Sequence, residues 1–445
     1  MIISKHILSF FTWAVLCSAT TKLLSRDNEH GPFEGHWVDA WAAMPQLTEP
    51  ANLPPPPFNS TDLVFFNTTI RQTLRIVANE SNYQMRIRLS NAFGLVELPI
   101  TSLTIAIPTE SDNRNLTGSS SIDITSLQHV TFSGNKSIVV PPGAIVVSDP
   151  LAVEACQIVS LSLYLASGQQ SQAITSHPGS RTTSWMSRGD HTLAENLTDA
   201  STTSVAHWYY ISAIEAWQPP SHSAFVLVGD SITDGRGSDT NGNNRWPDLL
   251  LDRMAVSSPG ISVINQAAGG NRVLADGLGP SALSRIERDV LSHSGVRYVL
   301  LFEGVNDIGT GDISPSAQGQ IGDRLIQAYR QIITRVHAMQ LPIFGATITP
   351  FGCDNTTIQP YSDPEREKTR QRMNEWIRES EGRPGGFDKV VDFDKVLRGQ
   401  NVSKLDSRYD GGDCLHPNVA GYTALAEAFP LGIFEEYREG VNGYV

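Results

Sequence analysis

The chain has 445 residues, of which 40% are hydrophobic and 18% are charged, and this composition excludes a disordered or low-complexity protein. Its length exceeds that of one ordinary domain and predicts two. The formal net charge of −13 repels nucleic-acid phosphates and anionic lipid surfaces, so neither is expected as a partner.

The N-terminus has the layout of a secretory signal peptide. Lys5 and His6 precede an apolar run over residues 7–17, and the small residues Ser18 and Ala19 follow. We expect residues 1–19 to be removed and the protein to be secreted. The apolar run is too short to span a bilayer comfortably, so no stable membrane insertion is expected. Eight Asn-x-Ser/Thr triplets agree with export and are candidate glycosylation sites: Asn59, Asn67, Asn79, Asn115, Asn135, Asn196, Asn355 and Asn401.

Residues 36–218 have the hydrophobicity pattern of short β-strands. Met85, Ile87 and Leu89 alternate with polar neighbours, a period of two that places one face of a strand inside and the other outside. Turn residues separate further short apolar runs. This pattern predicts an antiparallel β-sandwich or jelly roll as a first domain. The further strands are expected at 103–107, 137–140, 144–147, 158–165 and 208–214.

After Pro219 and Pro220 the hydrophobicity pattern changes, and residues 222–435 alternate between predicted strands and helices. Alternating strands and helices indicate parallel βαβ units and a three-layer α/β/α sandwich. In such a fold the active site lies at the carboxyl ends of the strands. We expect strands at 224–229, 261–264, 298–302, 342–349 and 390–393. The predicted helices cover 246–255, 282–291, 321–336, 364–378 and 419–429.

Four short motifs each follow a predicted strand of this second half. They are Gly-Asp-Ser-Ile at 229–232, Gly-Gly-Asn-Arg at 269–272, Gly-Val-Asn-Asp at 304–307 and Asp-Cys-Leu-His-Pro at 413–417. Each motif alone is weak, since such residues are common in turns. Their order and their shared position at strand ends are what favour one site.

The residue types suit nucleophilic catalysis. A serine hydroxyl needs a base, which His416 would supply for Ser231, and the histidine needs a carboxylate such as Asp413 to orient it. The backbone N–H groups of Ser231 and Gly270 and the side-chain amide of Asn306 would form an oxyanion hole.

With these motifs the sequence resembles the GDSL/SGNH hydrolases over about residues 224–430. The resemblance implies a flavodoxin-like α/β/α fold and ester hydrolysis through an acyl-enzyme. It assigns the nucleophile to Ser231, the oxyanion residues to Gly270 and Asn306, and the remaining triad residues to Asp413 and His416. Gly269 is a second possible register for the oxyanion glycine. The N-terminal β-domain resembles that of exported members grouped near the acetylxylan esterases.

Several residues near the predicted site could have structural roles instead of catalytic or binding roles. Asp230 and Asp307 are expected to hold loops in place, and Asp413 could also cap the last helix. Asp234 and Arg272 could touch substrate or lie on the surface. Trp208 and Trp246 are expected in the core rather than as sugar platforms.

The cysteines suggest one disulfide. Cys353 follows a predicted strand end and Cys414 lies within the Asp-x-x-His block, so both approach the same face and could be joined. Cys156 would then be left over, either unpaired or paired outside the chain. No metal or organic cofactor is expected, because the chain has no phosphate-binding loop, no zinc signature and no complete dinucleotide motif.

The sequence therefore predicts a secreted serine ester hydrolase that removes acetyl or other short acyl groups from carbohydrate. The partner would be an acylated small molecule or polysaccharide. The alternatives are a lipase or lysophospholipase, and a carbohydrate-binding protein without catalytic activity. Nothing in the sequence fixes the oligomeric state.

Overall fold

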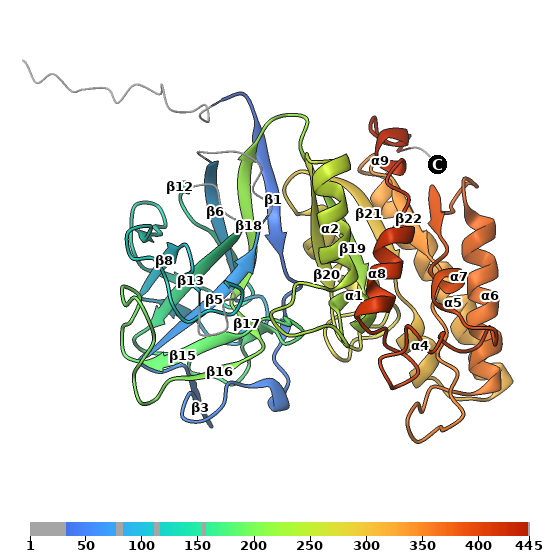
Figure 1. Ribbon diagram of the computed structural model, residues 1–445, viewed down its shortest axis with the longest axis horizontal. Helices are drawn as coiled ribbons and strands as arrows, with labels where there is room; N and C mark the ends of the chain where they lie inside the picture. The colour runs from blue at the N-terminus through green and yellow to red at the C-terminus, as the bar shows by residue number, and fades with distance from the viewer. Residues whose placement is uncertain (1–32, 77–82, 111–115, 154–156, 444–445) are drawn as a thin grey trace, which may run out of the picture.

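The computed structural model describes residues 33–76, 83–110, 116–153 and 157–443. It contains an antiparallel β region, coloured blue to green in Figure 1, and an α/β region, coloured yellow-green to red. The expected signal peptide, the sequons at Asn79 and Asn115, and Cys156 lie outside the described residues. Within the described ranges, no helix combines the length and apolarity that crossing a bilayer requires.

Among the described residues, the β region consists of two large sheets and three small sheets of two or three strands, and all of its named strand pairs are antiparallel. The first large sheet has the order β1-β18-β6-β11, with β12 also paired to β6, and the second has the order β16-β15-β5-β13-β8-β9. The strands are β1 His36–Ala42, β2 Gln46–Leu47, β3 Asn59–Ser60, β4 Leu63–Val64, β5 Thr68–Arg75, β6 Tyr83–Ser90, β7 Leu98–Ile100, β8 Ser102–Ala106, β9 Gln128–His129, β10 Ile138–Val140, β11 Ile145–Val147, β12 Leu151–Val153, β13 Ile158–Leu165, β14 Thr175–His177, β15 Ser184–Arg188, β16 Thr203–Val205, β17 Trp208–Tyr209 and β18 Ile211–Gln218.

One apolar core holds the two large sheets together, as a β-sandwich requires. The alternating residues Met85, Ile87 and Leu89 of β6 are fully buried in this core, which confirms the face predicted for that strand. The predicted strand 208–214 is divided in two, because Tyr210 has a positive φ of 62° that an extended strand cannot contain. Trp208 is buried in the same core, as expected.

The α/β region is built on a five-stranded parallel sheet. Its strands are β19 Ser223–Gly229, β20 Ile261–Ala267, β21 Val296–Phe302, β22 Ile343–Ala346 and β23 Lys389–Val391. Their order in the sheet is β20-β19-β21-β22-β23, which is the flavodoxin-like arrangement and confirms the predicted fold class. The first of these strands is buried at every position, as expected for the centre of a sheet covered on both faces.

Helices cover both faces of this sheet. On one face α2 packs against α8 and α8 against α7, and on the other α5 packs against α3 and α6 (Figure 1). The helices are α1 Ser231–Asp234, α2 Trp246–Ser257, α3 Ala282–Ile286, α4 Val305–Thr310, α5 Pro315–His337, α6 Pro364–Ser380, α7 Phe393–Leu397, α8 Val419–Ala428 and α9 Ile433–Glu436, with the 3-10 turn η1 Pro50–Asn52 in the β region.

The helix predicted at 282–291 is confirmed with those bounds, although its second half is π-helical: α3 is followed directly by η2 Glu287–Leu291. Two predicted strands are shorter in the structure than expected. The strand expected at 342–349 ends at Ala346, and the segment beyond it is an irregular buried loop. The strand expected at 390–393 ends at Val391, because Asp392 accepts a hydrogen bond from the Lys395 N–H and starts α7.

The two regions are joined along β1. Ala43, which follows β1, forms a parallel bridge with Asn265 of β20, and Ser262 Oγ donates to the Asp39 carbonyl. Val38 and Ala42 of β1 pack into the apolar core of the α/β region. Strand pairing changes from antiparallel to parallel between Gln218, the end of β18, and Ser223, the start of β19. The domain limits at 36–218 and 222–435 stay predictions.

Candidate active site

Ser231 lies where the central strand β19 turns into the short helix α1. Asp230 is the N-cap of this helix, and its carboxylate accepts a hydrogen bond from the Ile232 N–H at 2.9 Å. A Cβ at Gly229 would lie 2.5 Å from Thr233, so only glycine fits the end of the strand. The turn therefore places the Ser231 side chain at the carboxyl edge of the sheet, as predicted from the sequence.

The structure brings Ser231, His416 and Asp413 into one hydrogen-bonded relay. Ser231 Oγ lies 2.7 Å from His416 Nε2, and His416 Nδ1 lies 2.7 Å from Asp413 Oδ2. The hydroxyl and the ring are almost fully buried, while the carboxylate is partly exposed. These are the distances at which a base takes a hydroxyl proton and a carboxylate orients the base.

The Asp413 carboxylate also fixes its own loop. Its Oδ1 accepts hydrogen bonds from the backbone N–H groups of His416 at 2.8 Å and Leu415 at 3.1 Å. Burial opposes the charge, but the hydrogen bonds from the His416 ring and backbone outweigh it and hold the pKa of Asp413 well below its usual range. The alternative role as cap of the last helix was wrong, because Asn418 caps α8 and accepts from the Gly421 N–H.

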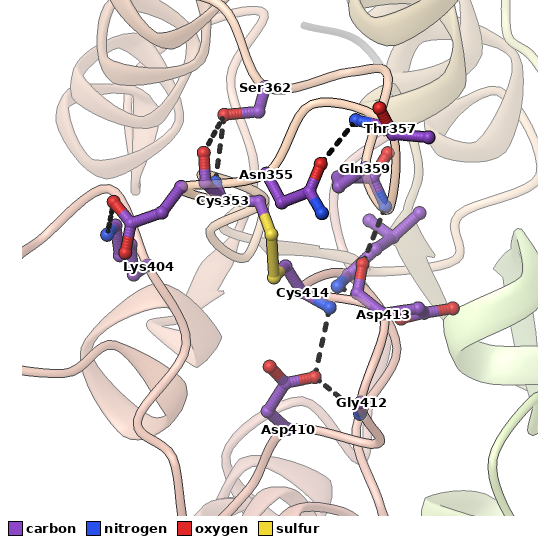
Figure 2. Close-up of a disulfide and its surroundings, with 12 residues drawn as sticks. Cys353, Asn355, Thr357, Gln359, Ser362, Lys404, Asp410, Gly412, Asp413 and Cys414 are labelled. Carbon is purple, nitrogen blue, oxygen red and sulfur yellow. Dashed lines mark hydrogen bonds and ion pairs between the residues drawn. A yellow bond between two sulfur atoms is a disulfide. The ribbon is translucent and has the colours of Figure 1, made fainter.

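Figure 2 shows the disulfide that pins this loop. Cys353, in the loop that follows β22, is bonded to Cys414, the residue after Asp413, as the sequence predicted. On either side, Asp410 accepts from the Cys414 N–H at 3.0 Å, and Gln359 donates to the Asp413 carbonyl at 3.0 Å. The loop that carries Asp413 and His416 is thus tied to a second loop by a covalent bond and by side-chain hydrogen bonds.

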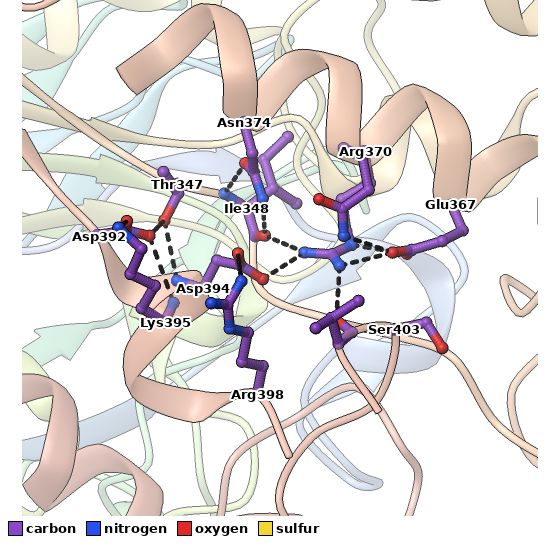
Figure 3. A network of polar contacts seen from close by, with 12 residues as sticks. Thr347, Ile348, Glu367, Arg370, Asn374, Asp392, Asp394, Lys395, Arg398 and Ser403 are labelled. Atoms are coloured by element: carbon purple, nitrogen blue, oxygen red, sulfur yellow. Dashed lines mark hydrogen bonds and ion pairs between the residues drawn. The ribbon is translucent and has the colours of Figure 1, made fainter. Parts of the chain in front are cut away.

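The partner loop is itself anchored by the buried Arg370 of α6 (Figure 3). The Arg370 guanidinium donates to the Ile348 carbonyl at 2.9 Å, to the Val402 carbonyl at 2.9 Å and to Asp394 Oδ1 at 2.7 Å. Gly352 then donates to the Ser403 carbonyl. The segment that carries Cys353 is therefore held on both sides before it reaches the disulfide.

The candidate oxyanion groups lie beside the serine. Gly270 has a φ of +71°, and a Cβ there would lie 2.5 Å from Leu278, so a glycine is required. The Gly269 N–H is already engaged by Asp234 Oδ2 at 3.0 Å, whereas the Gly270 N–H has no acceptor among the described residues. This difference favours Gly270 over the Gly269 register.

Asn306, on α4, faces the same space and is buried. Its Nδ2 donates to the Asn271 carbonyl at 2.9 Å, and its Oδ1 accepts from the Tyr361 hydroxyl at 3.0 Å. These two bonds fix the orientation of the amide and leave its second N–H free to donate. Tyr361 is a site residue that the sequence analysis missed, since it lies in a loop with no recognisable motif.

Buried carboxyl groups lie behind these donors. Burial, together with the nearby charges of Asp307 and Asp234, raises the pKa of Asp230 to about 7. Burial also raises the pKa of Asp307, although its carboxylate accepts the N–H groups of Val273 and Leu274. As expected, Asp230 and Asp307 hold loops in place.

A cleft of about 420 Å³ opens over the relay, and both regions line it. The α/β region contributes Ser231, His416, Gly270 and Asn306. The β region contributes residues that the sequence analysis did not single out, namely Gln46, Glu49, Asn52, Pro178, Gly179 and Arg181.

Asp234 and Arg272, which were each expected either to touch substrate or to lie on the surface, differ in their burial. Asp234 is buried and lines the cleft, so a surface role for it was wrong. Arg272 is partly exposed and donates to the Asp276 carbonyl. Trp246 is fully buried in the core, as expected.

The sequons differ in exposure. Asn135, Asn196, Asn355 and Asn401 are exposed, while Asn59 and Asn67 are half-buried. Glycosylation at all of them stays a prediction.

A serine–histidine–aspartate relay at the edge of a flavodoxin-like sheet is the site of a serine hydrolase. The family model described as GDSL-like lipase/acylhydrolase matches residues 227–424, a span that contains all four motifs. Residues 227–424 therefore form a GDSL-like lipase/acylhydrolase domain.

Several solved structures are similar to this chain. A lipase/acylhydrolase from Enterococcus faecalis is 20% identical, with 49% of this chain and 96% of that chain covered and a TM-score of 0.36. A carbohydrate acetylesterase family member from Sinorhizobium meliloti is 14% identical, with coverage of 48% and 98% and a TM-score of 0.36. An acetyl xylan esterase is 18% identical, with coverage of 46% and 96% and a TM-score of 0.33. No curated protein sequence matches this chain.

Proposed function

We propose that the protein is a secreted esterase that removes acetyl or other short acyl groups from carbohydrate through a covalent acyl-enzyme. The observation that carries the proposal is the relay of two 2.7 Å contacts from Ser231 through His416 to Asp413 at the floor of an open cleft.

In the first half of the reaction, His416 Nε2 takes the proton of Ser231 Oγ, and Oγ bonds to the ester carbonyl carbon. The carbonyl oxygen becomes an oxyanion and accepts hydrogen bonds from the Ser231 and Gly270 N–H groups and from Asn306 Nδ2. When the intermediate collapses, the carbon–oxygen bond to the alcohol breaks, and His416 gives its proton to the departing alcohol.

In the second half, water takes the place of the alcohol. His416 removes a proton from that water, whose oxygen attacks the acyl carbon, and the second intermediate releases the acid and returns the proton to Ser231 Oγ. Asp413 stays ionised throughout and steadies the imidazolium. Its lowered pKa suits this role.

The walls of the cleft support a sugar as the alcohol. Gln46, Asn52 and Glu49 of the β region line it, and their amide and carboxylate groups can hydrogen-bond to hydroxyl groups. A long apolar groove, which a lipid chain would need, is absent from the described lining of this cleft.

The test is hydrolysis of short-chain and long-chain acyl esters and of acetylated xylan by the wild-type protein and by Ser231→Ala. We expect activity on short esters and on acetylated xylan, and a loss of about 10⁴-fold or more in the variant. Ser316→Ala, an exposed serine at the start of α5, is the matched control and should keep full activity.

Other outcomes would overturn parts of the proposal. A preference for long acyl chains would favour a lipase, and equal inactivity of wild type and variant on every ester would favour a binding protein. Export from a host with a secretory pathway, with a mature N-terminus near residue 20, tests secretion.

A further inference from the structure

Two arginines in the cleft lack counter-ions. Arg181 and Arg236 line the same cleft as Ser231 and His416. Within the described part of the chain, neither guanidinium has an ion-pair or hydrogen-bond partner, and the Arg181 Nε–H is buried without an acceptor. Arg245, nearby in sequence to Arg236, is by contrast paired with Asp248 at 2.7 Å. Buried donors are normally satisfied, so the unpaired Nε–H of the half-buried Arg181 points to a ligand in the cleft. Arg236 is exposed, so its guanidinium is accessible to the same ligand.

The backbone holds Arg181 in an unfavourable conformation. Its φ is +50°, a left-handed value that is unfavourable for a non-glycine residue. The Asn241 N–H donates to its carbonyl at 2.8 Å and holds it there. Such strain is typical of residues whose side chain has a function.

Arg236 is fixed next to the nucleophile. Its N–H donates to the Ser231 carbonyl at 2.9 Å, and its own carbonyl accepts from the Tyr422 hydroxyl at 2.6 Å. Gly235 and Gly237 on either side have positive φ values of 98° and 100°. The cleft therefore receives one cation from the β region and one from the α/β region.

We propose that Arg181 and Arg236 form a subsite for a carboxylate, so that the preferred substrates are acyl esters of acidic sugars. The proposal rests on the proposed function and narrows its substrate class. A guanidinium presents a fork of N–H groups that matches a carboxylate. The remaining surface has a net negative charge and repels an acidic substrate, so local cations are needed for binding one. Glu49 forms no ion pair with either arginine in the described part of the chain, and its oxygens accept from the Gln46 and Asn52 amides.

The experiment compares two acetyl esters that differ in one group, an acetylated methyl glucoside and the corresponding acetylated methyl glucuronide. We expect wild-type kcat/KM to be roughly tenfold or more higher for the glucuronide, with KM for it rising with salt. In the double variant Arg181→Gln/Arg236→Gln this ratio should fall to about one. Arg372→Gln, an exposed arginine of α6 paired with Asp323, is the control and should keep the ratio.

A wild-type ratio of one, or a ratio that survives in the double variant, would overturn the subsite while leaving the esterase intact. If neither ester is cleaved by any variant, the proposed function itself fails and the subsite with it.

A second, independent feature links the β region to the loop that carries Gly269 and Gly270. His177, the last residue of β14, contacts the Met44 carbonyl through Nδ1 at 3.0 Å and Asp234 Oδ1 through Nε2 at 2.9 Å. Asp234 Oδ2 in turn accepts the Gly269 N–H at 3.0 Å. His177 and Asp234 are buried, 3% and 2% exposed, so solvent cannot replace these bonds.

The packing around Asp234 leaves no space for other arrangements. A Cβ at Gly179, two residues beyond His177, would lie 1.8 Å from Asp234 Oδ2. The carboxylate is thus confined between the β region and the glycine that precedes Gly270.

We infer that His177 is a positioning residue for catalysis: it holds Asp234 on the Gly269 N–H and thereby sets the direction of the Gly270 N–H. His177 lies outside the family match and reaches the reacting atoms only through Asp234.

The test is a double-variant cycle with His177→Phe and Asp234→Ala on a neutral short-chain ester. We expect each to lower kcat by roughly tenfold or more with little change in KM, because the affected contact exists only in the transition state. The double variant should be no slower than the slower single variant. Asp234→Asn should recover most of the rate, since an amide oxygen can still accept the Gly269 N–H.

A rise in KM with kcat unchanged, or effects of the two variants that multiply, would overturn this role. If His177→Phe fails to fold, His177→Gln with Asp234→Ala completes the same cycle.

Discussion

Arg71 in the β region and the carboxyl groups behind the nucleophile in the α/β region are buried ionisable groups with different roles. In the β region, Arg71 of β5 is fully buried and donates to Ser162 Oγ and to the carbonyls of Ser120, Glu195, His191 and Ala194. Burial lowers the pKa of Arg71 to about 10. Apart from Ser162 of β13, its partners lie in loops, so this cation ties loops to a strand.

In the α/β region the buried groups behind the nucleophile are carboxyls. Burial raises the pKa values of Asp230, Asp307 and Glu303. Two of them accept backbone N–H groups in the loops that carry the candidate catalytic residues. The difference teaches that the candidate catalytic groups are held within the α/β region, whereas the β region supplies stability, a wall of the cleft and the proposed positioning residue His177.

The largest effect expected from this comparison is at Asn306. Asn306→Ala should lower kcat by roughly 100- to 1000-fold, because one donor to the developing oxyanion is lost. Gln46→Ala, which alters the cleft wall contributed by the β region, should lower kcat/KM by less than about tenfold and act mainly through KM. Steady-state kinetics on one short-chain ester measures both. A larger loss of kcat/KM in Gln46→Ala than in Asn306→Ala would contradict the expected greater contribution of the α/β region to catalysis.

A smaller effect, on stability alone, is expected at Arg71. Arg71→Met leaves a hydroxyl and several backbone carbonyls without their donor, so the free energy of unfolding should fall by about 2–4 kcal/mol. The kcat of the protein that remains folded should be unchanged. Urea unfolding followed by tryptophan fluorescence measures the first quantity, and active-site titration with an organophosphorus reagent corrects the second for the folded fraction.

Lys136→Met, an exposed cation of the same region, is the control and should change the free energy of unfolding by less than about 0.5 kcal/mol. A fall in kcat per active site in Arg71→Met would show that Arg71 also affects catalysis. Its role would then not be limited to the stability of the β region.

The same contrast explains which features the sequence could predict. In a parallel sheet each loop that follows a strand reaches the same edge, so motifs at strand ends converge whatever the details of packing. For this reason Ser231, Asn306, Asp413 and His416 could be assigned to one site. Periodicity also predicted the long helix α5, whose buried stripe includes Leu325, Tyr329, Ile332 and Val336.

Features that depend on long-range packing escaped prediction. Tyr361 and Arg181 lie in loops whose approach to the cleft has no local signal. Asp234 resembled a solvated residue because nothing near it in sequence shows that His177 covers it. Helices α1 and α4 have four and six residues, too few to show a helical period.

The last prediction concerns pH and the carboxyl group next to the nucleophile. The pKa of Asp230 is about 7 in the folded protein and about 3.9 in an unfolded chain. Between these values the folded protein keeps a proton that the unfolded chain has lost. Stability therefore falls as pH rises from about 4 to about 7, by at most about 1.4 kcal/mol per pH unit from this group, and is constant above that range.

Asp230→Asn removes this titration while keeping an oxygen that can accept the Ile232 N–H. The difference in the free energy of unfolding, variant minus wild type, should increase as pH rises from about 4 to about 7 and level off above. Urea unfolding at half-unit pH steps measures it, and the same difference for Asp312→Asn, an exposed carboxylate whose pKa is lowered by Ser314, should not rise with pH. A flat profile for Asp230→Asn would mean that Asp230 is ionised in the folded protein. Asp230 would then be a charged group held by the Ile232 N–H, as the Arg71 guanidinium is held by the carbonyls around it.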